Sequence, residues 1–433
     1  MKRLFEKELY IWKNKEERKP LIVLGARQVG KTYCIEKFAK ENFDNLVKID
    51  FEKNISFKQI FDGDFEIDEI IDLISVQVNK EIVIGKTLLF LDKIQLCPRA
   101  LMSLRYFYED KPDLHIIVAG SLLEFELEKI SFPVGRVEFK FMYPLTFEEF
   151  LLATDNSKLL KYRSDLSCKK KVQEVIHQKF LKLLREYFIV GGMPEAVKTF
   201  VSKSIKEVSK IHSNLIEAFL QDIIKYERNI DLESLRIIFE KIPTLIGQEI
   251  KYTNISKNIS TYKIKQILNV LRKALLIHPV KSSSAKELPL MAGIEQKVLK
   301  YCFFDIGLMQ HICGISSFDI LQEKDLLANY KGGLCEQYIG QELIASGGSQ
   351  NNHLFYWHRN KKNSNAEIDY LIVDNGKILP IEIKNGPSGK LKSLHLFLEE
   401  HQDINDGFVL NSGNIGDIDN INFRPIYTKL REL

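Results

Sequence analysis

The clearest chemical signature in the sequence is the run Gly25-Ala26-Arg27-Gln28-Val29-Gly30-Lys31-Thr32, which fits the pattern GxxxxGK[ST]. In this pattern backbone N–H groups surround phosphates, the lysine reaches the β- and γ-phosphates, and the final hydroxyl binds Mg²⁺. The run follows the apolar stretch 21–24 and precedes a helical pattern, which is the context that the motif requires. We therefore expect ATP and Mg²⁺ to bind here. The expected nucleotide contacts are Gly25, Arg27, Gln28, Val29, Gly30, Lys31, Thr32 and Tyr33.

A second strand should end in an acidic residue that helps Thr32 to hold the magnesium ion, and TLLFLD at 87–92 supplies Asp92. Many such ATPases continue with a glutamate that activates the attacking water, but this chain has Lys93. An ammonium with a reference pKa of about 10.4 cannot accept that proton at neutral pH. Hydrolysis is then slow or absent, or Glu52 substitutes, or Lys93 lies away from the site. We favour weakened hydrolysis.

Two further polar residues are candidates for contact with the nucleotide. Ser121 follows the apolar run 115–120, where it could sense the γ-phosphate, although a serine that caps a helix fits equally well. Arg136 is a candidate arginine finger that would act on a neighbouring subunit and would therefore require a homo-oligomer. An ordinary surface arginine is the alternative that the spacing favours.

Another group of chemical residues lies in two strand-like runs that flank Asn375-Gly376, the strongest short signal for a hairpin. Counting outward from a two-residue turn, Asp369 faces Glu382, and Glu367 faces Lys384. Side chains alternate along a strand, so all four are expected on one face.

Two carboxylates directly opposite each other repel unless a cation lies between them. Mg²⁺ or Mn²⁺ bound by Asp369 and Glu382 would remove this conflict, with Lys384 placed to stabilise a phosphate or orient a water. The alternative is a solvated polar face with an ion pair between Glu367 and Lys384. That alternative leaves the Asp369–Glu382 pair unexplained, and both interpretations stay open.

The apolar pattern predicts how the elements that carry these residues are arranged. Short apolar runs alternate with amphipathic stretches in the first 150 residues or so, as in βαβ units with a mostly parallel sheet. These runs are LIVL at 21–24, LVKIDF at 46–51, TLLFLD at 87–92 and HIIVAG at 115–120. Helical patterns follow to about 240, and mixed α/β patterns return from about 330. The C-terminal order is α-β-β-β-α-β.

Composition limits the class of protein. The 433 residues suggest two to four domains, and 62 Lys and Arg against 58 Asp and Glu leave a net charge of +4, which does not demand a nucleic-acid partner. No apolar run approaches the roughly 20 residues of a membrane helix. The start of the chain lacks a signal-peptide core, and six cysteines without a CxxC pair are typical of reduced thiols. We expect a soluble cytoplasmic protein with no membrane contact.

Nearly the whole chain resembles prokaryotic AAA-type ATPases that carry a C-terminal domain of unknown function. The resemblance rests on GARQVGKT, LLFLDKIQ, AGSLLEFEL, FPVGRVEF, YPLTFEEFL, FIVGGMPEAV, GGLCEQYIGQEL and EIDYLIV followed by PIEIK. It implies ATP binding, a winged-helix module and a nuclease-like C-terminal domain. The C-terminal element order itself resembles the restriction-endonuclease-like PD-(D/E)xK core. On that resemblance Asp369, Glu382 and Lys384 are catalytic, and Glu336 joins Asp369 and Glu382 as a metal ligand.

These inferences together predict an α/β chain of four parts. They are a P-loop AAA-type domain at 1–155, a helical linker or lid at 156–240, a winged-helix-like domain at 241–330 and a restriction-endonuclease-like domain at 331–433. The winged helix would use Ile255–Ile259 and a recognition helix Thr261–Leu276, which carries Lys263, Lys265, Arg272 and Lys273. Such helices contact DNA in the major groove, but a protein-binding winged helix fits the pattern equally well.

Three functions are compatible with the sequence. The first is an ATPase that acts on DNA, in which the nucleotide state controls a metal-dependent nuclease-like domain. The second is a nucleotide-gated switch that hydrolyses ATP poorly and binds DNA or a partner without cutting it, which Lys93 favours. The third is a protein-scaffold ATPase without nucleic acid, which the near-neutral charge favours.

Overall fold

The computed structural model describes residues 1–121, 135–164, 170–227, 229–315, 333–347, 353–360, 365–384 and 391–430. Its backbone contacts divide the chain into two compact units. Residues 1–143 form the first unit, and residues 144–347 with 351–433 form the second. Among the described residues, no helix is both long and apolar enough to cross a membrane.

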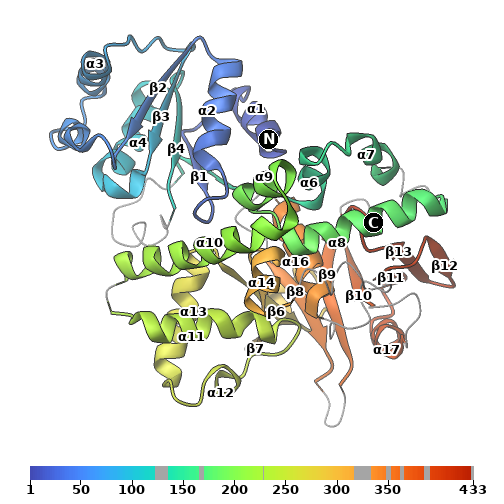
Figure 1. Ribbon diagram of the computed structural model, residues 1–433. Helices are drawn as coiled ribbons and strands as arrows, with labels where there is room; N and C mark the ends of the chain where they lie inside the picture. Colours follow the sequence, from blue (N-terminus) through green and yellow to red (C-terminus); the bar gives the residue numbers. More distant parts are fainter. Residues whose placement is uncertain are drawn as a thin grey trace. The chain divides into compact units, whose positions relative to one another are not determined.

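The first unit is an all-parallel sheet in the order β2-β3-β4-β1-β5, flanked by helices (Figure 1). Its elements are α1 (Phe5–Lys13), β1 (Leu21–Leu24), α2 (Lys31–Asn42), β2 (Asn45–Asp50), η1 (Ile55–Phe61), α3 (Ile67–Val78), β3 (Thr87–Asp92), η2 (Ile94–Leu96), α4 (Pro98–Asp110), β4 (His115–Ala119) and β5 (Glu138–Phe141). Every residue of β1, β3 and β4 is buried, as expected for parallel strands covered on both faces. The predicted βαβ arrangement is therefore confirmed.

Strand order also explains how distant motifs of the first unit meet. Because β1 lies between β4 and β5, and β4 pairs with β3, the segments that leave β1, β3 and β4 emerge at the same edge of the sheet. Ligands of open parallel sheets bind at the carboxyl ends of the strands.

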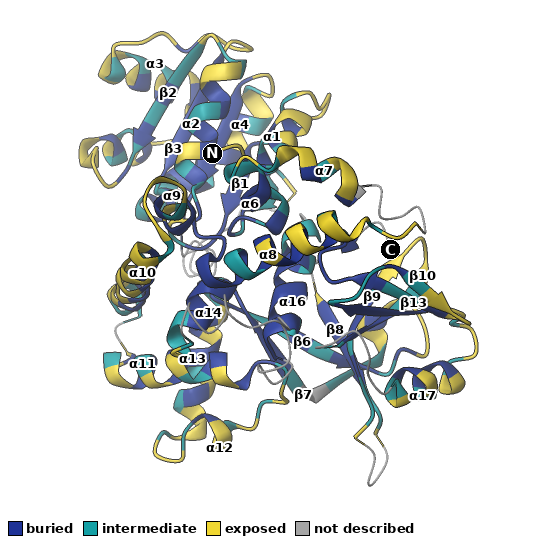
Figure 2. Ribbon diagram, turned by 45° about the vertical axis from the view of Figure 1, so that its right-hand side comes forward, coloured by how far each residue is buried: buried dark blue, intermediate teal, exposed yellow. Residues whose placement is uncertain are grey.

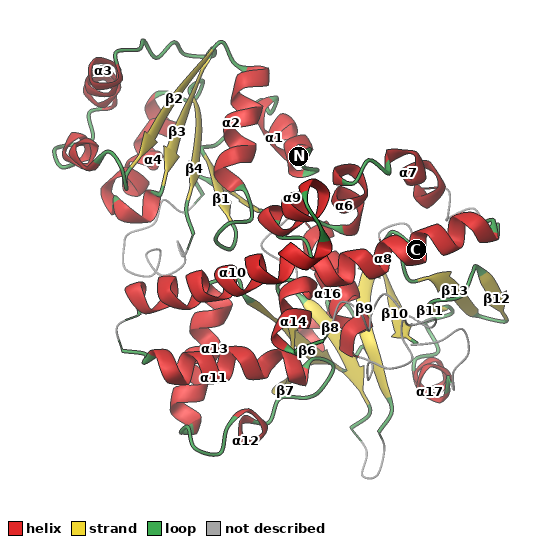
Figure 3. Ribbon diagram, in the orientation of Figure 1, coloured by secondary structure: helices red, strands yellow, loops and turns green. Residues whose placement is uncertain are grey.

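The second unit contains a bundle of helices and an eight-stranded mixed sheet (Figure 3). Its helical part comprises α6 (Phe147–Ala153), α7 (Ser157–Ser164), α8 (Glu174–Val190), α9 (Pro194–Ser202), α10 (Ile205–Tyr226), α11 (Leu232–Lys241), η4 (Ile242–Leu245), α12 (Tyr252–Ile255) and α13 (Thr261–Lys273). The remaining elements are β6 (Ile277–Ser283), η5 (Leu290–Gly293), β7 (Ile294–Phe303), α14 (Ile306–Ile312), α16 (Gly333–Gly347), β8 (Leu354–His358), β9 (Glu367–Asp374), β10 (Lys377–Ile383), α17 (Lys392–Glu400), β11 (Gly407–Asn411), β12 (Gly416–Ile418) and β13 (Ile421–Pro425). Figure 2 shows that α10 buries one face and exposes the other, as its sequence alternation requires.

The eight-stranded sheet has the order β12-β13-β11-β10-β9-β8-β6-β7. The predicted order α16-β8-β9-β10-α17-β11 is present. However, β6 pairs in parallel with β8, so two strands of the predicted 241–330 segment continue the sheet of the predicted 331–433 segment. The four-part division stays a prediction about which segments fold independently.

The predicted winged-helix helices need correction. The first helix is Tyr252–Ile255 rather than 255–259, since the Ser256 hydroxyl accepts the N–H of Asn258 and the chain turns there. The second helix ends at Lys273 rather than 276. Leu275 adopts a positive φ of 59°, which ends the helix before β6 begins.

The predicted hairpin of β9 and β10 forms with the expected register. Asp374 pairs with Lys377, and the ladder continues to the pair Tyr370–Ile381. Asn375 and Gly376 both have positive φ, which a two-residue turn of this kind requires. On its other edge β9 contains a bulge, because Phe355 pairs with Leu371 whereas Trp357 pairs with Ile368. Asp369 and Tyr370 therefore lie opposite one residue of β8, and such bulges re-aim side chains.

Three of the motifs that carry the family resemblance meet in a buried polar network. The Thr146 side chain and Glu149 form a capping box at the start of α6, and the N–H of Phe147 donates to Glu342 on α16 at 2.8 Å. The Gly192 N–H donates to the Asp305 carboxylate at 2.7 Å, and the Leu145 N–H donates to the Gly192 carbonyl at 2.7 Å. These motifs therefore serve packing within the second unit.

Substituting alanine for Gly192 should destabilise the second unit. The added Cβ would lie 2.2 Å from the Leu145 carbonyl oxygen, and the Leu145–Gly192 hydrogen bond keeps the two backbones together. Overpacking of this kind costs about 1–3 kcal/mol, so the midpoint of thermal unfolding should fall clearly. Gly416→Ala is the matched control, since nothing lies within 4 Å of its added Cβ. Equal midpoints for the two variants would contradict the prediction.

Candidate functional site

The predicted phosphate loop connects β1 to α2, as the sequence indicates. Gly30 precedes α2 with a φ of 97°, and an added Cβ at Gly25 would lie 2.2 Å from the Met142 carbonyl oxygen. Both positions therefore require glycine for a physical reason, namely a left-handed conformation at Gly30 and a close backbone approach at Gly25. The N-terminus of α2 provides free N–H groups and a positive dipole end for a phosphate.

Within this loop, Lys31 contacts carbonyls of the loop itself, and Thr32 contacts the acidic end of β3. The Lys31 ammonium donates to the carbonyls of Gly25 and Ala26 at 2.7 and 2.9 Å. The Thr32 hydroxyl donates to Oδ2 of Asp92 at 2.9 Å, and Asp92 is 3% exposed. This hydrogen bond brings together the two predicted magnesium ligands, Thr32 of the loop and Asp92 of β3.

A hydroxyl and a carboxylate at this separation fit Mg²⁺. The ion is usually held by one or two carboxylates, with waters and substrate phosphates completing its shell. Lys48 on β2 also lies close, with Nζ 3.4 Å from Asp92 Oδ2 and 2.7 Å from Glu36. Burial opposes the charged form of Lys48, but the Glu36 hydrogen bond and the Asp92 charge outweigh it and raise the lysine pKa.

The other predicted nucleotide contacts differ in their surroundings. Val29 is fully buried within the loop, and Tyr33 is 57% exposed. Gln28 is exposed with a φ of 65°, and Arg27 is partly buried. Their assignment to the nucleotide stays a prediction.

Two residues near the loop were not predicted from the sequence. The Arg3 guanidinium donates to the carbonyls of Val29 and Tyr143, both at 2.7 Å, and so fixes the loop to the end of the first unit. Gln95 is 6% exposed, and its Oε1 has no hydrogen-bond partner among the described residues. An added Cβ on Gly120 would lie 2.6 Å from that oxygen, so the Gln95 amide is placed between β3 and the end of β4. The motif LLFLDKIQ includes Gln95, but its spacing alone indicates no role.

The structure also locates Lys93 and the alternatives considered for it. Lys93 has a φ of 58°, and its N–H donates to Asp92 Oδ1 at 3.0 Å. Glu52 is exposed beyond β2, and its N–H donates to Asp50.

Ser121 and Arg136 lie in different surroundings. Ser121 is buried just beyond the end of β4. Arg136 is 43% exposed at its side chain and forms an ion pair with Glu109 at 2.8 Å, which fits the surface-arginine alternative.

The C-terminal carboxylates form a second cluster, which lies within the second unit. Asp369 accepts the Ile383 N–H at 2.6 Å, just beyond the last ladder pair of β9 and β10. Lys384 forms an ion pair with Glu382 Oε1. Glu367 pairs instead with Lys300 on β7, so the proposed Glu367–Lys384 ion pair is wrong. The sequence argument for that ion pair could not include Lys300, because β7 joins the sheet of β9 only by way of β8 and β6.

Glu336 joins this cluster from α16. Its Oε2 lies 3.8 Å from the Lys300 ammonium, and its backbone carbonyl accepts the Tyr370 hydroxyl at 2.9 Å. We refer below to Glu336, Glu367, Asp369, Glu382, Lys300 and Lys384 as the carboxylate cluster. It holds four acids and two cations.

Burial and mutual repulsion disfavour ionisation of all four acids together. Burial raises the pKa of Glu336, and so does the neighbouring Asp369 carboxylate. The pKa of Glu382 is raised by the same two causes. Conversely, burial opposes the charge on Lys300, but Glu336 and Glu367 outweigh it and raise the lysine pKa. Burial is the larger cause for the two acids, and the excess of carboxylates over cations adds to it and also explains the direction for Lys300.

The arrangement of the carboxylate cluster determines which metal ions fit it. Among the described residues, no group of three or more His, Cys, Asp and Glu side chains is arranged to hold a metal. Glu382, however, is 5% exposed, and its Oε2 has no hydrogen-bond partner there. A buried carboxylate oxygen without a donor is costly, and a cation next to Asp369 would satisfy it. Two carboxylates with waters fit Mg²⁺ or Mn²⁺.

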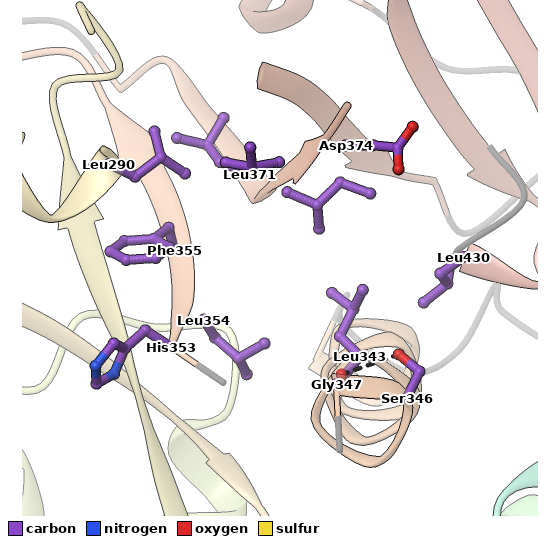
Figure 4. Close-up of a pocket in the computed structure, with 12 residues that line it drawn as sticks. Leu290, Leu343, Ser346, Gly347, His353, Leu354, Phe355, Leu371, Asp374 and Leu430 are labelled. Atoms are coloured by element: carbon purple, nitrogen blue, oxygen red, sulfur yellow. Dashed lines mark hydrogen bonds between the residues drawn. The ribbon is translucent and has the colours of Figure 1, made fainter. Parts of the chain in front are cut away.

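A separate cavity of about 310 Å³ lies near the turn end of β9 (Figure 4). Leu290, Phe355 and Leu371 contribute apolar walls, and Asp374 lies at its margin. The Ser346 hydroxyl there donates to the Leu343 carbonyl of its own helix. None of the predicted site residues lines this cavity.

The basic residues of α13 are partly engaged. Lys263 forms an ion pair with Asp231, Lys265 lies over the Tyr252 ring, and Arg272 donates to Asn269 at 2.8 Å. The buried face carries Ile264 and Leu271. This helix therefore packs through its apolar side and presents cations on the other.

The parallel sheet, the glycine loop and the Thr32–Asp92 contact are the features of a P-loop nucleotide-binding domain. In agreement, residues 17–151 match the family model described as "AAA domain". Residues 181–319 and 331–425 match two families described as "Domain of unknown function", DUF8612 and DUF4143.

Individual relatives are distant. An uncharacterised protein of Methanocaldococcus jannaschii, MJ1637, is 22% identical over 281 residues, which span 61% of this chain and 57% of that protein. The Walker-type ATPase PABY2304 of Pyrococcus abyssi is 15% identical with a TM-score of 0.43, over 71% of this chain and 94% of that one. DnaA from Aquifex aeolicus bound to AMPPCP is 12% identical with a TM-score of 0.29, over 63% and 86%.

Replacing Asp92 with asparagine should remove the magnesium dependence of ATP binding. The amide keeps the size of the side chain but withdraws the anionic ligand next to Thr32, and loss of a ligand should cost more than the roughly 10–100-fold in metal affinity that outer groups contribute. ATP binding should therefore be equally tight with Mg²⁺ and with EDTA in a titration with fluorescent ATP. Asp50→Asn is the control, because Asp50 pairs with Asp92 in register but accepts backbone N–H groups. Retained magnesium dependence in Asp92→Asn would refute the assignment.

Proposed function

We propose that this chain binds Mg-ATP in the first unit and uses its nucleotide state to control a metal-dependent, DNA-directed site in the C-terminal part. The observation that carries the ATP part is the Thr32–Asp92 hydrogen bond beside the phosphate loop. The carboxylate cluster supports the second part, because acidic ligands and a lysine are the groups that phosphodiester hydrolysis needs.

In the proposed nucleotide site, each residue has one task. Backbone N–H groups from Gly25 to Lys31 surround the phosphates, and the Lys31 ammonium would exchange its loop carbonyls for phosphate oxygens. Thr32 and Asp92 would hold Mg²⁺, which supplies charge neutralisation for the phosphates. Gln95 could orient a water through its amide, although it cannot act as a base.

In the proposed DNA site, Asp369 and Glu382 would hold a divalent ion that polarises a phosphodiester and its attacking water. Lys384, beside Glu382, would stabilise negative charge on the phosphate. The cations Lys265, Arg272 and Lys273 on α13 provide candidate contacts with the DNA backbone. The proposal includes Mg²⁺ at both sites and DNA as the partner. It also includes assembly into a homo-oligomer, in which Arg136 would act as a finger on a neighbouring subunit.

A second candidate is a nucleotide-gated switch that binds DNA or a protein without cutting it. Lys93 favours this candidate, since no carboxylate directly follows Asp92 to activate water. The Lys300–Glu367 ion pair favours it as well, because an internal cation already neutralises part of the cluster. A scaffold ATPase without nucleic acid is the third possibility.

Phosphate release from Mg-ATP separates these candidates. We expect purified protein to release phosphate faster with duplex DNA than without it, and Lys31→Ala to remain at background because the phosphate-binding cation is lost. Tight ATP binding without turnover in either condition would support the switch. Turnover that DNA does not change would support the scaffold, and so would the absence of salt-sensitive duplex binding.

Cleavage at the carboxylate cluster is tested by nicking of supercoiled DNA with Mg²⁺ or Mn²⁺ and ATP. Asp369→Ala should abolish nicking, because it removes one of the two proposed ligands. Asp374→Ala is a matched control on the same strand, since Asp374 is exposed at the hairpin turn. Equal nicking by both variants would attribute the activity to another site, and no nicking by the wild type would favour the switch.

A further inference from the structure

Lys300 belongs to the carboxylate cluster, but no pattern in the sequence predicts its presence there. Its side chain is 3% exposed, and it comes from β7, where Val280 of β6 pairs with it in the sheet. The ammonium forms an ion pair with Glu367, lies 3.8 Å from Glu336 and is 4.8 Å from the centre of the Tyr356 ring. Its position is therefore fixed by the sheet and by three side chains.

Backbone also packs closely against the acids that surround Lys300. An added Cβ at Gly247, which has a φ of 80°, would lie 2.9 Å from Glu336 Oε1, so the chain approaches this carboxylate closely. The Tyr356 hydroxyl donates to Glu249 at 3.4 Å. Removing the ammonium would leave Glu336 and Glu367, whose side chains are only 15% and 30% exposed, without their cation, which is unfavourable.

By their direct contacts the two cations divide the cluster into halves, with Glu336 and Glu367 beside Lys300 and one oxygen of Glu382 paired with Lys384. The Lys300 charge also acts on Asp369, where it opposes the burial that raises the pKa of that carboxyl. The other Glu382 oxygen is buried without a donor among the described residues, and Asp369 accepts one backbone N–H. The unmet demand for positive charge therefore lies in the Asp369–Glu382 half.

We propose that Lys300 is a resident cation that limits the cluster to one divalent ion. The ion is held by Asp369 and Glu382, while the ammonium occupies the Glu336–Glu367 half that a second ion would need. Glu336 is then a partner of Lys300 and not a metal ligand. This inference rests on the proposed metal site and deepens it, because it determines how many metal ions the site takes.

The test counts Mn²⁺ bound to the full-length protein without nucleotide, by calorimetry and by electron paramagnetic resonance of free Mn²⁺. Every protein in the series, including the one called wild type, carries Asp92→Asn, so that the proposed Thr32–Asp92 site does not add to the count. Wild type should bind one ion, and Asp369→Asn should bind none. Lys300→Met should bind two, because Glu336 and Glu367 lose their cation. Lys300→Met with Glu367→Gln should return to one, since one carboxylate of the freed half is neutral. Lys281→Met on the neighbouring strand is the control and should leave the count at one.

A second comparison does not depend on the folding of the Lys300 variant. Glu336→Gln should weaken Mn²⁺ binding less than about tenfold, whereas loss of a true ligand in Glu382→Gln should exceed the roughly 10–100-fold that outer groups contribute. A count that stays at one in a folded Lys300→Met protein would overturn the inference and leave the metal site intact. Two ions in wild type, or a ligand-sized loss in Glu336→Gln, would also overturn it. No Asp369-dependent binding in wild type would overturn the proposed metal site together with this inference.

Discussion

Buried hydrogen bonds from the polar side chains of α16 hold the second unit together. Gln337 bonds both the N–H and the carbonyl of Phe303, and Gln341 accepts the Ile306 N–H while donating to the Tyr187 hydroxyl. Glu342 accepts a hydrogen bond from the Phe147 N–H and forms an ion pair with Arg163. Burial raises the pKa of Glu342, although Arg163 opposes that shift. Removing one partner of such a buried pair costs roughly 3–5 kcal/mol, so α16 has little freedom to move.

This constraint extends to the carboxylate cluster, because the same helix carries Glu336. Its carbonyl receives the Tyr370 hydroxyl from β9, and the β9 bulge sets Asp369 beside Tyr370. The position of the acids is thus determined by packing that begins near Leu145, far away in the sequence. A rigid surround is what a metal site needs, since ligand geometry must be held before the ion arrives.

Local sequence patterns were sufficient to predict those parts of the structure that are determined by residues close together in the sequence. The phosphate loop, the buried strands and the Asn375-Gly376 hairpin follow from short-range chemistry, and each was predicted. Lys300 and Arg3 were not, because their partners are reached only through strand order and chain packing. The same reason explains the error over Glu367. Within the hairpin alone, Lys384 is the nearest cation to Glu367, because the hairpin sequence does not show that Lys300 of β7 reaches this acid. Helix ends between 252 and 276 were misplaced because a single turn at Ser256 and a positive φ at Leu275 decide them.

The pairing of β6 with β8 has a consequence for the history of the chain. Lys300 reaches its carboxylate partners only when β6 and β7 extend the sheet that β8, β9 and β10 begin. Recombination near residue 330 would leave an open strand edge on one fragment and a lysine without acids on the other. Each of the two segments therefore depends on the other for a complete sheet. Within such proteins, a lysine at the position of Lys300 should vary together with the acids at positions 336 and 367.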